Sequence, residues 1–172
     1  MPKIRSQIKK LKLKKKDIWI KVLGMWKNKK PDPLKYLKNL RKEWDRINLR
    51  MIFIDTNVII NYFKAEARSV NFFEKYKNKD TFGISIITKI ELTSYPNITE
   101  EELLKIEEFL KEFIIIPVDE NIASICSYLR RKYKTKLGDS IIAATAIYYN
   151  SPLSTFNIRD FKKIRELKLI SL

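Results

Sequence analysis

The chain has 172 residues, 45% of them hydrophobic, which is enough to bury the core of one domain with an appendage. It has one cysteine, Cys126, and no histidine, so an internal disulfide, a histidine-based catalytic triad and a histidine-ligated metal are all excluded. Any hydrolysis must therefore use carboxylates, with a metal that prefers oxygen ligands. No apolar run is long enough to span a membrane, so we expect a cytoplasmic protein without integral membrane association.

Charge divides the chain at Met51. Residues 1–50 contain 18 Lys and Arg against four acids, a net charge of +14, whereas residues 51–172 contain 18 against 16, a net charge of +2. Dense basic segments commonly bind nucleic-acid phosphates, although a solvated tail is the alternative. We therefore expect a basic, mostly helical extension over residues 1–50 and a self-contained domain over residues 51–172. Met51 also offers an alternative translation start.

The extension contains two apolar segments. The patch at residues 18–26 is interrupted by Lys21 and could contact RNA, a membrane surface or the protein's own core. Asp32 and Pro33 are a typical cap and first residue of a new helix. That helix carries an apolar stripe, which must be buried against the following domain, a second copy of the chain or another protein, and which comprises Leu34, Leu37, Leu40, Trp44 and Ile47.

Strand and helix patterns alternate after residue 50. We expect strands at residues 51–54, 82–86, 114–118, 153–155 and 167–172. Between them we expect helices at residues 56–63, 70–76, 99–113, 119–131 and 139–149, one more that carries Glu91, and a short one near Asp160. Thr99 and Glu102 have the spacing of a capping box. Such alternation predicts an α/β fold with a parallel sheet of four to five strands between helices on both faces.

Polar side chains follow several of these strands. Asp55 comes directly after the first strand, Glu91 about one helical turn after the second, Asp139 at the start of a helix, and Asn157 and Asp160 after the fourth. Loops at the carboxyl ends of parallel strands meet at one edge of a sheet, which is where ligands collect. Each residue alone could be structural, as a helix cap or a solvated acid. Together, these crowded carboxylates favour a site for Mg²⁺ or Mn²⁺ and a substrate phosphate.

Four motifs in order carry a resemblance to a known family. They are MIFIDTNVII with Asp55 and Thr56, SIITKIEL with Glu91, LGDSIIAATAIYYN with Asp139, and PLSTFNIRDF with Thr155, Asn157, Asp160 and Phe161. On these motifs, residues 51–172 resemble a PIN domain of the VapC toxin type, a family of metal-dependent ribonucleases. The resemblance implies a three-layer PIN-like fold.

The resemblance also implies roles for single residues. Asp55, Glu91 and Asp139 would be catalytic and would bind the metal, with Asn157 and Asp160 as possible further ligands. Many members of the family carry a fourth acid where this chain has Asn157, whose amide oxygen can coordinate a metal but brings no charge.

Two threonines complete the expected site. Thr56 and Thr155 would position water or phosphate, or would merely satisfy backbone groups.

The function implied by the resemblance is that of an endoribonuclease, which hydrolyses RNA phosphodiester bonds with Mg²⁺ or Mn²⁺. It would be a toxin held in check by a cognate antitoxin, and we expect a homodimer. The alternative is a non-catalytic PIN-like module that binds RNA or protein, which Asn157 favours and the three intact acids oppose. A phosphatase of the haloacid dehalogenase type fits less well, because its motif needs a second Asp where Asn57 stands.

Overall fold

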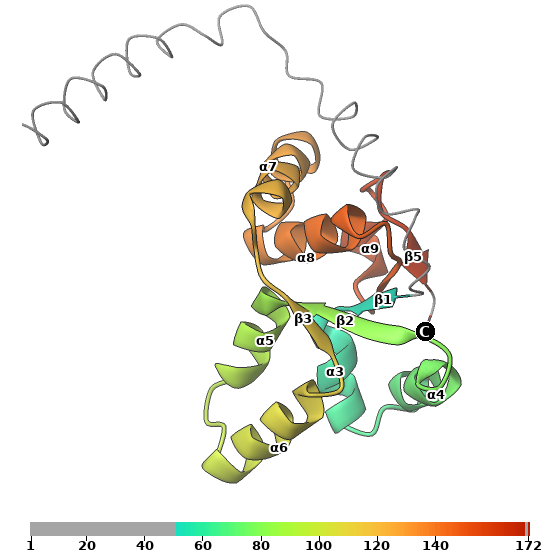
Figure 1. Ribbon diagram of the computed structural model, residues 1–172, viewed down its shortest axis with the longest axis vertical. Coiled ribbons are helices and arrows are strands. Elements are labelled where there is room, and N and C mark those ends of the chain that lie inside the picture. The colour runs from blue at the N-terminus through green and yellow to red at the C-terminus, as the bar shows by residue number, and fades with distance from the viewer. Residues whose placement is uncertain (1–50, 171) are drawn as a thin grey trace, which may run out of the picture. The chain divides into compact units, whose positions relative to one another are not determined.

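Residues 51–170 and residue 172 are the part of the chain that the computed structural model describes (Figure 1). The basic helical extension expected over residues 1–50, with its apolar patch and its apolar stripe, lies outside the described residues. The division of the chain at Met51 therefore stays a prediction.

A five-stranded sheet forms the centre of the domain. Its spatial order is β3-β2-β1-β4-β5, and all four neighbouring pairs are parallel. The strands are β1 (Met51–Ile54), β2 (Thr81–Ser85), β3 (Ile114–Ile116), β4 (Leu153–Ser154) and β5 (Leu169–Ile170). Because parallel strands cannot be joined by tight hairpins, each connection crosses the sheet through a helix or a long loop. The expected parallel sheet of four to five strands is confirmed.

Side chains of β1 alternate between two hydrophobic cores. Met51 and Phe53 belong to the core that contains buried side chains of α7 and α8, whereas Ile52 and Ile54 belong to the core that contains those of α3, α4 and α6. Successive side chains of a strand point to opposite faces, so the sheet must be covered on both sides. Figure 1 shows α7 and α8 on one side of the sheet and α3 and α6 on the other. The expected three-layer architecture is thus present.

Seven helices connect the strands in the described part of the chain. They are α3 (Thr56–Phe63), α4 (Ala67–Tyr76), α5 (Ile86–Thr93), α6 (Glu100–Leu110), α7 (Glu120–Tyr133), α8 (Leu137–Tyr148) and α9 (Ile158–Phe161). The expected capping box is present at α6, where the Thr99 and Glu102 side chains each accept a backbone N–H of the other residue. Within the described residues, no helix is both long and apolar enough to cross a membrane.

Several elements begin or end elsewhere than expected. The α4 helix begins three residues early, because the Glu66 side chain caps it by accepting the Ser69 N–H at 2.9 Å. The β3 strand, at the edge of the sheet, ends before Pro117, which has no backbone N–H with which to continue the pairing to β2. The α8 helix begins at Leu137, so Asp139 is the third residue of this helix and does not cap it.

A glycine in β2 allows β1 to pack closely beside it. A Cβ atom on Gly83 would lie 2.8 Å from the Met51 sulfur and 3.2 Å from Cε1 of Phe53, which is 1% exposed. We expect Gly83→Ala to lower the free energy of unfolding by about 1–3 kcal/mol, measured by urea denaturation, because the new methyl group overpacks this core. In a Met51→Ala background the same substitution should cost less. An equal cost in both backgrounds would contradict this explanation.

Candidate functional site

Asp55 lies at the carboxyl end of β1 and caps helix α3. Its backbone is extended, and its Oδ1 atom accepts the N–H of Thr56 at 2.8 Å. The residue is 5% exposed, so its carboxylate is withdrawn from water. An N-cap residue has an extended backbone, and its short side chain can accept an N–H of the first helical turn. The local sequence therefore fixes one oxygen of Asp55 and leaves the other to contact the neighbouring strand.

The second oxygen of Asp55 is held by residues from two segments. Thr155 follows β4, the neighbour of β1 in the sheet, and donates its hydroxyl to Oδ2 of Asp55 at 2.6 Å. The side-chain amide of Asn57 donates to the same oxygen at 2.6 Å, and its Oδ1 accepts the N–H of Phe156 at 3.0 Å. Asn57 thus ties the ends of β1 and β4 together around Asp55.

The site expected from the sequence does not include Asn57. The signal for it was present, since it is the third residue of the Asp-Thr-Asn motif, but its partner Phe156 is 99 residues away.

Glu91 reaches the same edge from helix α5. Its Oε2 atom accepts the hydroxyl of Thr56, the residue next to Asp55. On its other side, a Cβ atom on Gly138 would lie 3.2 Å from Oε1 of Glu91, so the first turn of α8 passes directly against this carboxylate. The hydroxyl of Thr56 and the backbone at Gly138 together define where the Glu91 carboxylate lies.

This contact makes Gly138→Ala a specific probe of the site. The added methyl group should displace the exposed Glu91 carboxylate by a few tenths of an ångström, whereas the neighbouring core should remain intact. If Glu91 has the catalytic role that the motifs imply, activity should fall by about 10-fold, because misplacing a catalytic group is costly, while the free energy of unfolding should change by less than about 1 kcal/mol. Activity assays and urea denaturation measure the two effects. A parallel loss of both would point to general misfolding instead.

Asp139 and Asp160 lie at the same edge of the sheet. We call the four residues Asp55, Glu91, Asp139 and Asp160 the acidic edge. Burial raises the pKa of Asp139, and the negative charge of Asp160 raises it further, while Lys136 and Lys163 oppose the rise. Asp160 is the third residue of α9 and accepts the Asn157 side-chain amide at 2.9 Å. The backbone N–H of Asn157 donates to the Thr155 hydroxyl at 2.9 Å, which links α9 to the partner of Asp55.

The acids of this edge influence one another electrostatically. Burial raises the pKa of Asp55 to about 6, against a usual value of 3.8. Hydrogen bonds from Thr155 and Thr56 counteract this rise, whereas the charges of Asp139 and Glu91 add to it. Asp55 therefore carries an electrostatic strain that a nearby cation would relieve.

The raised pKa of Asp55 predicts how stability depends on pH. Folding favours the protonated carboxyl, so this contribution is fully present below about pH 3.8 and is lost as the pH rises through about 6. We expect Asp55→Asn to raise the free energy of unfolding in EDTA at pH 7.5, because the buried side chain no longer carries a charge. The gain should be at most about 3 kcal/mol, since the amide has one acceptor oxygen where the carboxylate has two. Urea denaturation should show that this advantage shrinks at pH 4. A difference that does not vary with pH would contradict the charge explanation.

The ligand atoms of this edge suit a hard divalent cation. Carboxylate and amide oxygens are what Mg²⁺ and Mn²⁺ prefer, and a cation would offset the repulsion around Asp55. Across residues 51–170 and 172, however, no three acidic or cysteine side chains are close enough to form a ready-made metal site. The structure thus brings Asp55, Glu91, Asp139 and Asp160 to one edge, without making them converge on a single point.

Comparison with known proteins identifies similar chains. Residues 52–167 match the PIN domain, and they include every acid of this edge. Ribonuclease VapC1 from Methanocaldococcus jannaschii is 32% identical over 142 residues, which cover 79% of this chain and 96% of the relative.

Solved structures show the same similarity. A chain of a toxin-antitoxin complex from Klebsiella pneumoniae is 30% identical with a TM-score of 0.61, and the match covers 67% of this chain and 94% of that chain. A chain of VapBC2 from Rickettsia felis, solved with a DNA fragment of its promoter, is 27% identical with a TM-score of 0.64, covering 71% and 98%.

Proposed function

The chain belongs to the PIN domain family, and we propose that it is a metal-dependent endoribonuclease of the VapC toxin type, which hydrolyses RNA phosphodiester bonds. The observation that carries the proposal is the acidic edge itself. Three separate segments bring Asp55, Glu91 and Asp139 close enough for the last two to raise the pKa of the first. A purely structural role would not require three repelling carboxylates at the carboxyl end of a parallel sheet.

Asp55, Glu91 and Asp139 would hold the metal. A bound Mg²⁺ or Mn²⁺ would supply positive charge at the phosphodiester and make an attacking water more acidic. The chain's own contribution is to orient these carboxylates. Thr155 fixes Oδ2 of Asp55 at 2.6 Å, and the hydroxyl of Thr56 donates to Glu91, so these two acids each have a hydrogen-bond donor that sets their direction.

Asn157 and Asp160 lie at the edge of the proposed site. The Asn157 amide N–H donates to Asp160 at 2.9 Å, so the two residues act as a pair and not as independent ligands. The electrostatic effect of Asp160 on Asp139 supports a role for Asp160 in supplementing the charge of the site. Asn157 would contribute its amide oxygen, a weaker ligand than a carboxylate.

The names of the similar structures extend the proposal to partners. The Klebsiella chain comes from a toxin-antitoxin complex, and the Rickettsia chain was solved as VapBC2. We include a cognate antitoxin protein, a homodimer and a cytoplasmic location in the proposal.

Inducing the full chain in a bacterial host should arrest growth, and Asp55→Asn should abolish this arrest.

The direct test is cleavage of RNA by the purified full-length chain. We expect internal cuts in total RNA with Mg²⁺ or Mn²⁺ and none in EDTA, with the cut ends identified by sequencing. Cleavage that persists in EDTA would exclude the metal-dependent mechanism. RNA binding without any cleavage at any divalent-metal concentration would instead support the non-catalytic module.

A further inference from the structure

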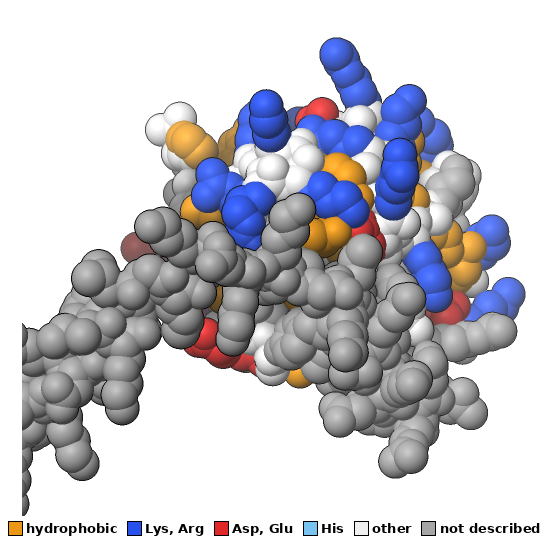
Figure 2. All heavy atoms as spheres, turned by 90° about the horizontal axis from the view of Figure 1, so that it is seen from above, with side chains coloured by type: hydrophobic (Ala, Val, Ile, Leu, Met, Phe, Trp, Pro, Cys, Tyr) orange, Lys and Arg blue, Asp and Glu red, His pale blue; other side chains and the backbone are white. Residues whose placement is uncertain are grey.

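Charge is distributed unevenly within the domain. Residues 51–129 contain eight Lys and Arg against 13 acids, whereas residues 130–172 contain ten against three, so the two parts carry net charges of −5 and +7. Figure 2 views the molecule from above the α7 and α8 side of Figure 1, and it shows lysine and arginine side chains gathered on this face. A nearly neutral domain thus has a strongly basic part.

A hollow of about 580 Å³ lies between the end of α7 and the start of α8. We call it the basic hollow, because Arg130, Arg131 and Lys134 line it, together with Thr135 and Leu137. Lys134 ends α7 in the left-handed conformation, with φ of 52°, and this turns the chain back toward α8. The loop is held by the Ser140 hydroxyl, which donates to the Lys136 carbonyl at 2.6 Å.

The cations of the basic hollow lack acidic partners. In the described part of the chain, Arg130, Arg131 and Lys134 form no ion pair. Five other cations of the described residues form ion pairs with nearby acids: Arg68–Glu66, Lys77–Glu74, Lys105–Glu101, Lys111–Glu108 and Lys132–Glu166.

The helix dipole accounts for only part of this charge. It stabilises Arg130 and Arg131 in the last turn of α7, but Lys136 is the N-cap of α8, where a positive charge is unfavourable. Stabilisation of the helices therefore does not explain all the positive charge in and beside the basic hollow.

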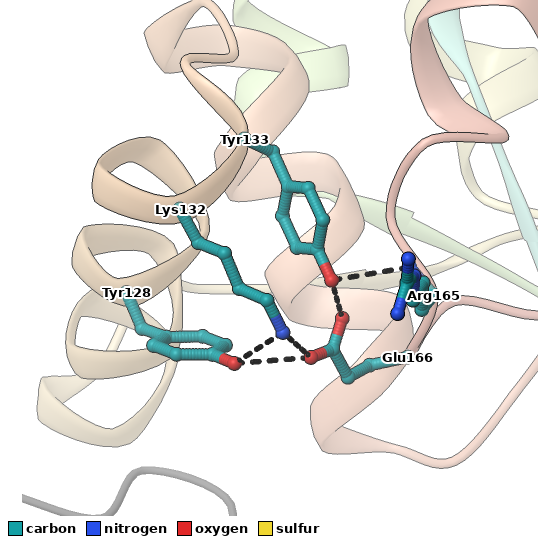
Figure 3. Close-up of polar contacts among 5 residues, drawn as sticks. All are labelled: Tyr128, Lys132, Tyr133, Arg165 and Glu166. Atoms are coloured by element: carbon teal, nitrogen blue, oxygen red, sulfur yellow. Dashed lines mark hydrogen bonds and ion pairs between the residues drawn. The ribbon is translucent and has the colours of Figure 1, made fainter.

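Lys132, near the basic hollow, has a structural role. The Lys132 ammonium donates to Glu166 at 2.8 Å and to the Tyr128 hydroxyl at 2.7 Å, while Tyr133 donates to the other oxygen of Glu166 at 2.6 Å (Figure 3). This network fastens the end of α7 to the segment that precedes β5. Because Lys132 is engaged there, we exclude it from the basic hollow.

The basic hollow and the acidic edge share the first turn of α8. Leu137 lines the hollow, and Asp139 lies two residues further along the same turn. Lys136 and Lys163 act electrostatically on Asp139, so basic side chains extend to the acidic edge itself. A polyanion with one phosphate at Asp139 would therefore meet the charges of Lys136 and Lys163 first.

We propose that the basic hollow binds the sugar–phosphate backbone of the substrate RNA next to the bond that is cleaved. This inference rests on the proposed ribonuclease function and names the surface that holds the substrate. Phosphate contacts of this kind position a strand without reading its sequence. The hollow would therefore set affinity and the direction of the strand across the site, whereas Asp55, Glu91 and Asp139 carry the chemistry.

The test compares two triple variants of the full-length chain that lose the same charge. The hollow variant carries Arg130→Gln, Arg131→Gln and Lys134→Gln, and the matched control carries Lys77→Gln, Lys105→Gln and Lys111→Gln. Affinity for a labelled single-stranded RNA is measured in EDTA at several salt concentrations. If three phosphate contacts are lost, the hollow variant should bind up to about 100-fold more weakly at 0.1 M salt, with a salt slope flatter by roughly 2. The control should change far less.

Binding in EDTA separates this inference from the proposed function. With Mg²⁺, the hollow variant should show a higher KM and an unchanged kcat. RNA affinity equal to that of the control would overturn the inference even if the enzyme cleaves RNA. Loss of binding to a polyglutamate peptide, without loss of RNA binding, would also overturn it and assign the hollow to an acidic protein. A chain that binds RNA through the hollow but never cuts it would end only the nuclease proposal.

Discussion

Asp55→Asn, Glu91→Gln and Asp139→Asn are each expected to lower kcat/KM for RNA cleavage by a factor on the order of 10² or more. Each substitution removes one negative charge from the edge that would hold the metal, and electrostatic groups of this kind contribute the largest single share of catalysis in many enzymes. Rates at increasing Mg²⁺ concentrations measure both the metal requirement and the residual activity. We expect the Mg²⁺ concentration for half-maximal activity to rise in all three variants.

An exposed acid far from the edge provides the control. Glu112 lies between α6 and β3, and Glu112→Gln removes the same charge without touching the site. It should retain nearly full activity and an unchanged metal requirement. If any of the three site variants kept the activity of Glu112→Gln, that residue would have no part in the chemistry.

Deletion of residues 1–50 is expected to weaken RNA binding by about 100-fold or more at 0.1 M salt. The segment carries a net charge of +14, and each phosphate contact that is lost should flatten the salt slope by roughly 0.7 on single strands. Three lost contacts already account for the 100-fold change. The kcat on a saturating short RNA should survive, because every proposed ligand lies beyond residue 50. Titrations of both chains at several salt concentrations measure the effect.

Thermal unfolding of the two chains separates binding from packing. If the apolar stripe of residues 34–47 is buried on the following domain, the truncated chain should unfold at a lower temperature or aggregate through newly exposed apolar surface. Unchanged affinity together with an unchanged salt slope would remove the RNA-binding role of the extension.

The order and type of the elements could be predicted because they depend on short-range patterns. The β1 strand and α3 have the expected bounds, and the capping box of Thr99 and Glu102 formed as predicted. These patterns are the spacing of hydrophobic residues, with a period of 2 in strands and 3.6 in helices, and the positions of caps and prolines. Each involves residues that are close together in the sequence. The position of Asp55 at the end of a buried strand followed from the same local signals.

Element ends were predicted less accurately where side chains compete for backbone groups. The α8 helix starts two residues before Asp139, although no side chain caps it. Its Ser140 hydroxyl instead donates to the Lys136 carbonyl and lies 2.5 Å from the hydroxyl of Thr135, and these contacts hold the entry to the helix. Such contacts involve specific geometry that sequence spacing does not encode.

Local sequence patterns indicated which acids could form the site, whereas the packing of distant segments places the residues that hold them. Asp55 meets Thr155 across 100 residues, because β4 returns to lie beside β1 in the sheet. The same strand order places Asn57 against Phe156, and the packing of α5 on α8 places Glu91 against Gly138. Local periodicity specifies each strand and helix, but it does not specify strand order, so contacts between distant segments arise only when the whole core packs.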